Sequence, residues 1–190
     1  MASAYRAAGF LALVAFGSAA NAQVKKSFPT DDEIKLVLTQ TERAVQQYKP
    51  LIDQLQLELG DTVKDAVTRD REVVAALETA VKAFRNQPQG FNGPLGFSLF
   101  EWLDDAMRNS LLCASNASIE VTSQMLIGNT EKASSLLGLS HACADVSTLI
   151  YTVSENAGTL YQRYLGTITD VAEQAVATVQ KCEDILKKKK

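Results

Sequence analysis

The chain has 190 residues, of which 46% are hydrophobic and 22% charged, and its formal net charge at pH 7 is −3. This length and apolar content suit one domain with its own hydrophobic core. The acidic balance argues against a nucleic-acid-binding protein, because such a protein needs a basic face to neutralise phosphates.

The first 22 residues have the pattern of a secretory signal peptide. One basic residue, Arg6, precedes an apolar run over residues 7–16, and the segment ends in Ala20-Asn21-Ala22, the small-x-small motif of a cleavage site. The apolar run is too short to span a bilayer. We therefore predict an exported protein, extracellular or periplasmic, whose mature part (residues 23–190) has no transmembrane segment.

Residues 31–59 form the first predicted helix. Thr30 and Glu33 have the spacing of a capping box, in which each side chain accepts a hydrogen bond from the other residue's backbone N–H group. Apolar residues then recur at alternating intervals of three and four, which places them on one face of an amphipathic helix. Pro50 lies inside this helix and predicts a kink, because proline cannot donate the helical hydrogen bond.

Residues 62–86 form the second predicted helix and complete a hairpin with the first. Gly60 suits the turn between them, because glycine readily adopts the left-handed conformation that ends many helices. One long helix bent at Gly60 is also compatible with the apolar pattern. The charged residues 69–72, with Asp70 among them, are predicted to lie on the solvated face.

The segment 87–103 is rich in glycine, proline and aromatic residues and contains the longest predicted connection. Its glycines do not form a phosphate-binding loop, since Pro94 lacks an N–H donor and no lysine follows at the required spacing. We predict that its aromatic side chains, with residues from later helices, plug one end of the fold and line a ligand entrance or cavity. The predicted lining residues are Phe91, Phe97, Phe100, Trp102, Met107, Met125, Tyr161 and Tyr164.

Residues 98–127 and 130–165 form the second predicted hairpin. Ser98 and Glu101 have capping-box spacing at its start, and Gly128 with Asn129 suits the turn. The two helices are therefore predicted to run antiparallel.

The apolar pattern continues beyond residue 165 with the same helical spacing. One uninterrupted helix to residue 188 would be about 87 Å long, which is too long for a compact domain. We therefore predict a break at Gly166 before a C-terminal helix at 168–188, with a kink at Gly166 as the alternative. The predicted fold is all-α: an antiparallel four-helix bundle with a fifth C-terminal helix or a helical extension.

Three cysteines lie in the predicted mature chain, and export makes disulfide bonds available. Cys113 and Cys143 are equally distant from Gly128, so the hairpin places them opposite each other. We predict a disulfide bond between them, which closes a loop of about 30 residues and contributes roughly 3 to 4 kcal/mol through chain entropy. Cys182 then stays a free thiol, is buried, or links two chains; the alternative is that all three remain thiols.

The sequence contains no recognisable catalytic or metal-binding constellation. His141 is the only histidine, whereas a metal site between helices needs several His or Glu ligands. Glu101, Asp104 and Asp105 fall in a predicted first helical turn, where acids favour the helix dipole. We therefore predict no enzyme activity and no cofactor. Asn116 begins an Asn-Ala-Ser sequon and is a candidate glycosylation site if it faces solvent.

Two predictions for function follow. The first is a secreted binding protein that carries a small apolar or lipid ligand in a cavity between its helices. The second is an extracellular structural or protein-interaction module that acts through helix faces, with the spare Cys182 indicating a homodimer. Whether the helices enclose a cavity or pack solidly distinguishes the two.

Overall fold

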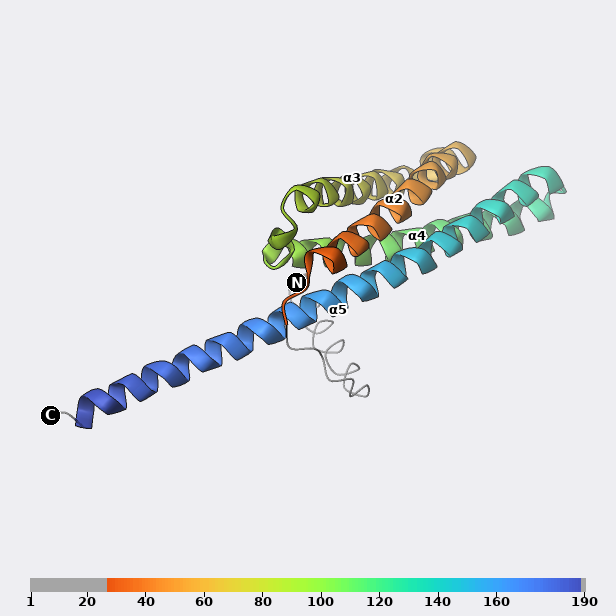
Figure 1. Cartoon of the computed structure of the whole chain (residues 1–190). Helices are drawn as coiled ribbons and strands as arrows, with labels where there is room; N and C mark the ends of the chain where they lie inside the picture. Colours follow the sequence, from red (N-terminus) through yellow and green to blue (C-terminus); the bar gives the residue numbers. More distant parts are fainter. Residues whose placement is uncertain (1–26, 189–190) are drawn as a thin grey trace.

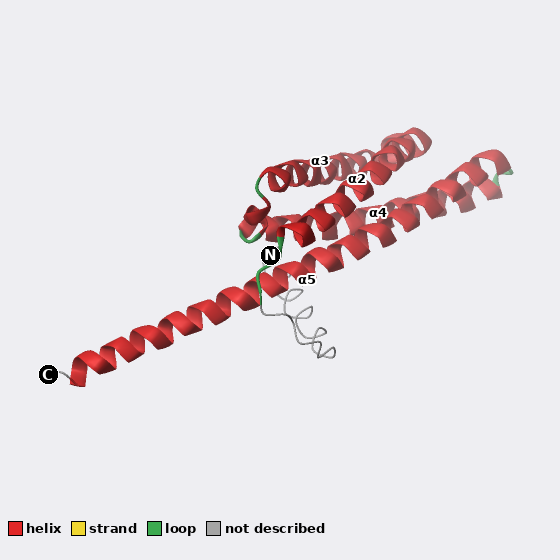
Figure 2. Cartoon of the chain, viewed as in Figure 1, coloured by secondary structure: helices red, strands yellow, loops and turns green. Residues whose placement is uncertain are grey.

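The structure, a computed structural model, describes residues 27–188 of the chain. The signal peptide predicted over residues 1–22 lies outside the described residues. Within them every regular element is helical (Figure 2), so the predicted all-α class is confirmed. The elements in chain order are α2 (Asp31–Leu59), the 3-10 helix η2 (Gly60–Val63), α3 (Lys64–Asn86), the 3-10 helix η3 (Pro88–Phe91), α4 (Pro94–Leu126) and α5 (Thr130–Lys188).

Two helical hairpins pack against each other (Figure 1). The first consists of α2 and α3 and the second of α4 and α5, with the most extensive contact between α4 and α5. Between the hairpins, α2 lies against α5 and α3 against α4. We call the packed part of the molecule, residues 27–164, the helical body.

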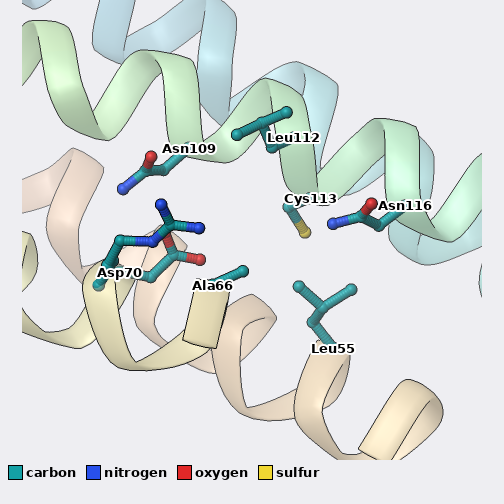
Figure 3. Close-up of a pocket in the computed structure, with 8 residues that line it drawn as sticks. Leu55, Ala66, Asp70, Asn109, Leu112, Cys113 and Asn116 are labelled. Carbon is teal, nitrogen blue, oxygen red and sulfur yellow. The ribbon is translucent and has the colours of Figure 1, made fainter. Parts of the chain in front are cut away.

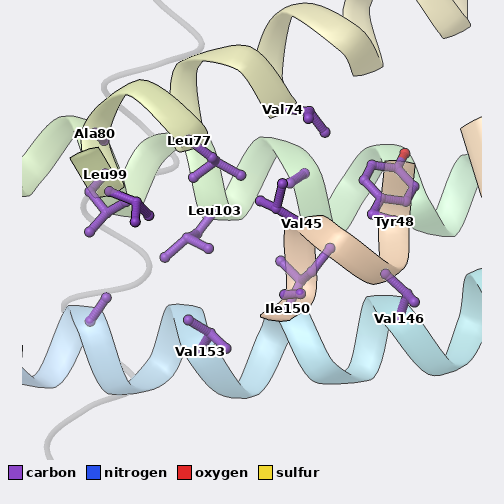
Figure 4. Close-up of a cluster of buried hydrophobic side chains, with 14 of the residues drawn as sticks. Val45, Tyr48, Val74, Leu77, Ala80, Leu99, Leu103, Val146, Ile150 and Val153 are labelled. Carbon is purple, nitrogen blue, oxygen red and sulfur yellow. The ribbon is translucent and has the colours of Figure 1, made fainter. Parts of the chain in front are cut away.

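The helical body has one hydrophobic core to which all four α-helices contribute (Figure 4). The apolar residues that recur at intervals of three and four in each helix meet there, because that spacing puts them on a single face. Side chains in this cluster include Val45 and Tyr48 of α2, Leu77 of α3, Leu99 and Leu103 of α4, and Val146, Ile150 and Val153 of α5.

The predicted start and end of the first helix are confirmed. Thr30 accepts a hydrogen bond from the Glu33 backbone at 3.3 Å, and the Glu33 carboxylate accepts one from the Thr30 backbone at 2.9 Å. At the other end Gly60 has a φ of 60°, so a turn rather than a bent helix separates α2 from α3. Pro50 does not interrupt α2.

The prediction for residues 69–72 is wrong at one position, because Asp70 is buried. The face of α3 that packs inward carries Val67, Asp70 and Val74, whereas Val73 is only partly buried. Asp70 thus lies on the buried face of the helix, which brings a carboxylate into contact with the core.

The fourth helix begins earlier than predicted. α4 starts at Pro94 rather than Ser98, and proline is well suited to the first helical position because its φ is already helical. Gly96 lies so close to the chain before it that an added Cβ would be 2.0 Å from the Phe91 carbonyl oxygen. Consequently Glu101, Asp104 and Asp105 do not lie in the first turn, and Asp104 pairs with Arg108 at 2.6 Å.

The predicted break at Gly166 and the fifth helix at 168–188 are wrong, because α5 is one helix of 59 residues. The residues expected to start a new helix make bonds typical of a helix interior. The Thr167 hydroxyl donates to the Arg163 carbonyl at 2.9 Å, and the Thr169 hydroxyl donates to the Leu165 carbonyl at 3.0 Å. The alternative of a helical extension describes the structure.

Candidate docking surface on the extension of α5

The last part of α5 leaves the helical body and continues alone (Figure 1). Up to Cys182, Leu160 is the last buried residue of α5, and every residue from Val171 to Cys182 is exposed. We call residues 165–188 the α5 extension; at 1.5 Å per residue it is about 36 Å long. A free helix of this length is unusual in a soluble fold, since most helical stability comes from packing.

The α5 extension is amphipathic. Its apolar stripe consists of Ile168, Val171, Ala175, Val179 and Cys182. With about 100° of rotation per residue, these five side chains share one face of the helix. The side chains of Ile168, Val171 and Val179 are 42%, 52% and 59% exposed. The α5 extension thus presents a continuous apolar face that the described residues leave uncovered.

The apolar stripe continues the face that α5 buries within the helical body. The same rotation places Val153, Ala157 and Leu160 in line with Ile168 and Val171. The opposite side of the extension carries polar residues such as Glu173. The stripe therefore lies on the side of α5 on which α2 and α4 sit farther up the helix.

Aromatic rings gather where the extension leaves the helical body. Phe97 of α4 contacts Tyr161 with ring centroids 5.6 Å apart, and Tyr161 contacts Tyr164 at 5.8 Å. Phe28, which precedes α2, contacts Tyr164 at 6.1 Å. These rings cover the end of the core at the point where the apolar stripe begins.

An ion pair fixes the direction of α5 at the same point. The Arg163 guanidinium donates to both carboxylate oxygens of Glu33, with Nη1 2.9 Å from Oε1. The Glu33 carboxylate is also the acceptor of the α2 capping box, so one side chain joins the start of α2 to α5. These bonds, with the Arg163 hydrogen bond as the largest cause, lower the pKa of Glu33 to about 2.

The predicted cysteine pairing is confirmed. A disulfide bond joins Cys113 of α4 to Cys143 of α5, with Cα atoms 5.9 Å apart. Two serines allow the same helices to approach closely: Ser140 donates to the Ala114 carbonyl at 2.9 Å and Ser147 to the Met107 carbonyl at 3.2 Å. Cys182 is a free, exposed thiol on the α5 extension.

The predicted ligand-entrance residues do not form one site. Phe97, Tyr161 and Tyr164 come together as described, and the Phe100 ring lies against Gly158 of α5. Phe91 is fully buried against Phe84, with centroids 5.8 Å apart, while Trp102 and Met107 pack against the core. Met125 is 64% exposed near the turn between α4 and α5, at the other end of the helical body.

A small hollow lies between α2, α3 and α4 (Figure 3). Its volume is about 10 Å³, which is room for one water molecule. Leu55, Asp70, Asn109 and Asn116 are among its lining residues, and none of the predicted entrance residues contributes. Asn116 is half-buried there, so its glycosylation stays a prediction that requires an outward-facing side chain.

Asp70 is the one charged residue among the buried residues that the structure describes, and the sequence pattern did not predict its burial. Burial raises the pKa of its carboxyl group, and the neighbouring Tyr48, Arg69 and Asn109 side chains oppose that shift. Burial also raises the pKa of Tyr48, and the neighbouring Asp70 carboxylate raises it further. The only sequence signal was an acid in line with Val67 and Val74.

A second, open groove of about 280 Å³ runs over α2 and α3. Ion pairs between Lys49 and Glu78 at 2.7 Å and between Arg71 and Asp53 at 2.8 Å cross it. Because these charged side chains already satisfy one another, the groove does not present a free apolar or ionic site.

Within residues 27–188, no group of His, Cys, Asp and Glu side chains is arranged to hold a metal ion, and His141 is exposed. By length and composition alone, α5 contains a stretch apolar enough to cross a membrane, and 44% of that stretch is buried inside the protein. Comparisons with protein-family models, curated proteins and solved structures find no match for this chain.

Proposed function

We propose that this chain is a secreted, non-enzymatic interaction protein, in which an antiparallel four-helix bundle holds the α5 extension out as a docking element. The observation that carries the proposal is the uncovered apolar stripe on a helix that has left its own core. A face of this kind typically binds a protein, because helix-in-groove and helix-to-helix contacts bury such stripes.

The composition of the α5 extension supports a bound partner. Eight of its residues are β-branched, a class that loses side-chain freedom in a helix: Thr167, Ile168, Thr169, Val171, Val176, Thr178, Val179 and Ile185. Such a segment gains little stability as an isolated helix in water, whereas burial of its apolar stripe against a partner stabilises the helix.

The disulfide bond supports the proposed route of export. Cys113 and Cys143 lie at bonding distance, and disulfides persist mainly in oxidising compartments. The signal-peptide pattern of residues 1–22 points the same way.

Site-specific photo-crosslinking in the secreted fluid of the producing cells tests the proposal. A photoreactive residue at Val171 or Val179 should crosslink to protein, while one at Ala177, on the polar side of the same helix, should not. Crosslinking at Ala177 equal to that at Val171, or no protein adduct at either position, would contradict a docking role for the stripe.

A carrier of apolar ligands is the second proposal, and its ligand would lie on the stripe rather than inside the bundle. The hollow between α2, α3 and α4 has room only for a water molecule, so it does not support an internal lipid site. Native mass spectrometry of the gently purified protein should then detect a bound lipid, and fatty acids should raise the melting temperature. Neither result is expected if the stripe binds protein.

A further inference from the structure

The geometry of the α5 extension also indicates what occupies it, an inference that rests on the interaction role proposed above. We infer that the partner is a second copy of this chain, whose own α5 extension lies antiparallel along the first. Three features lead to this arrangement: the position of the helical body, the distribution of charge and the position of the smallest stripe residue.

The helical body obstructs a parallel pair. The apolar stripe lies on the same side of α5 as Val153 and Leu160, which are buried against the other helices. In a parallel pair the second α5 would continue along this side beyond Leu160, into space already filled by α2 and α4 (Figure 1). In an antiparallel pair the two helical bodies lie at opposite ends of the paired extensions and on opposite sides of them, so neither body blocks the other copy.

The charges along the extension favour the same direction. Its first half contains the acids Asp170 and Glu173 and no basic residue, whereas three lysines outnumber two acids in its second half, residues 177–188. An antiparallel pair brings the basic half of each copy beside the acidic half of the other. A parallel pair would place like charges together.

The register follows from the middle of the stripe. Ala175 has its smallest side chain, which permits the closest approach of two helices. With the two-fold axis at Ala175, Val179 lies opposite the partner's Val171 and Cys182 lies opposite the partner's Ile168. Lys181 is then within one residue of the level of the partner's Asp170.

This register keeps the two Cys182 thiols apart. Each Cys182 lies level with the partner's Ile168, so the two thiols are separated by fourteen residues, or about 21 Å along the helix. That distance is far beyond the reach of a disulfide bond. The dimer is therefore held by the stripe and not by a covalent link through Cys182.

A lipid surface fits the extension less well than a second copy. Membrane-bound amphipathic helices carry lysine and arginine on their polar face, but the first half of the extension carries only acidic charge. Binding to lipid is nevertheless a separate outcome in the test.

Sedimentation equilibrium of the purified mature chain is the first measurement. The wild type should be a dimer, and Val171→Glu with Val179→Glu should weaken dimerisation by at least about 100-fold, because each dimer loses four buried apolar side chains. The matched control, Thr169→Glu with Ala177→Glu, adds the same charge to the polar side and should remain dimeric. Unchanged melting of the α2–α5 core in all variants excludes misfolding as the cause.

Cysteine crosslinking is the second measurement and reports the direction. Ile168→Cys should form a reducible dimer through the partner's Cys182, and the dimer should disappear when Cys182→Ser is added. The wild type should run as a monomer on a non-reducing gel. A wild-type crosslink through Cys182 would overturn the antiparallel arrangement.

The remaining outcomes separate this inference from the proposed function. A purified chain that is monomeric, but that crosslinks to another secreted protein at Val171, overturns the self-association and leaves the docking role intact. A monomer that binds vesicles of anionic lipid through the stripe, and crosslinks to no protein, overturns both.

Discussion

The two parts of α5 have the same sequence pattern and opposite environments. Residues 130–164 and residues 165–188 both repeat apolar side chains at intervals of three and four along one continuous helix. In the first part Val146, Val153 and Leu160 are buried, whereas in the second Val171 and Val179 are more than half exposed. The spacing of apolar residues therefore defines which face of a helix is apolar, but not which part of the protein, or which partner, buries that face.

The two parts of α5 differ in burial because the other helices pack against only the first part. The segment up to Tyr164 is joined to α4 by the disulfide and two serine hydroxyls, and to α2 by the Glu33–Arg163 ion pair. Beyond Tyr164, no helix among the described residues lies against it. Four paired comparisons test this difference between the two parts of α5. Three set a substitution in the helical body against one on the α5 extension, and the fourth concerns the boundary between them.

The two kinds of cysteine should give the largest contrast. Cys113→Ala with Cys143→Ala should lower the free energy of unfolding by roughly 3 to 4 kcal/mol, because the closed loop spans 30 residues. Cys182→Ala, on the extension, should change it by less than about 0.5 kcal/mol. Urea titration followed by circular dichroism, at a concentration below the dissociation constant of the inferred dimer, measures both free energies, and equal losses would mean that the extension is part of the cooperative core.

Two leucines on α5 should differ nearly as much. Leu139 is buried and Leu165 is partly exposed, so Leu139→Ala should cost about 3 kcal/mol while Leu165→Ala costs less than about 1 kcal/mol. The measurement is made below the dissociation constant of the inferred dimer, because association would add to the cost at Leu165. A loss at Leu165 as large as that at Leu139 under these conditions would place the boundary of the core farther along α5.

Glu33 stabilises the boundary between the helical body and the α5 extension through its ion pair with Arg163. Glu33→Gln removes the anchor of Arg163 and half of the capping box; we expect a loss of about 1 kcal/mol, because solvent screens a carboxylate that is 41% exposed. The folded-state pKa of Glu33 is lowered from 4.5 to about 2, so its contribution is present above pH 4.5 and is lost as the pH falls to about 2.

Stability curves measured between pH 7 and pH 2 should therefore show wild type and Glu33→Gln converging over that range. Asp32→Asn is the matched control, since Asp32 is almost fully exposed and lies 3.7 Å from Lys35. A constant difference between wild type and Glu33→Gln at all pH values would argue against the ion pair as the cause.

Two glycines on α5 should give the smallest contrast, of opposite sign. Gly158→Ala brings a Cβ to 3.1 Å from the Phe100 ring and should destabilise the core slightly, whereas Gly166 has no neighbour within 4 Å. Gly166→Ala should stabilise the local helix by about 0.5 to 1 kcal/mol, because alanine loses less backbone entropy than glycine. Slower amide hydrogen exchange over residues 163–170, with an unchanged melting temperature, would be the expected result.

Local pattern was sufficient where the interaction lies within one helix or one hairpin. The helical class, the Thr30–Glu33 capping box, the turn at Gly60 and the pairing of Cys113 with Cys143 depend on spacing along the chain. The pattern failed where a residue's environment comes from a distant segment: Asp70 is buried where α3 meets α2 and α4, and Met125 is exposed although α4 makes its most extensive contact with α5.

The sequence by itself determined that the chain forms amphipathic helices, where most of them begin, and that α5 keeps one apolar face along its whole length. Only the tertiary structure decided that α5 continues through Gly166 and that its last 24 residues lie outside the helical body. The physical reason is that helix periodicity is a local property, whereas burial depends on which other helices are long enough to reach. The two helices that pack against α5, α2 and α4, do not extend along its whole apolar stripe, and the uncovered remainder is the surface for which we propose a docking role.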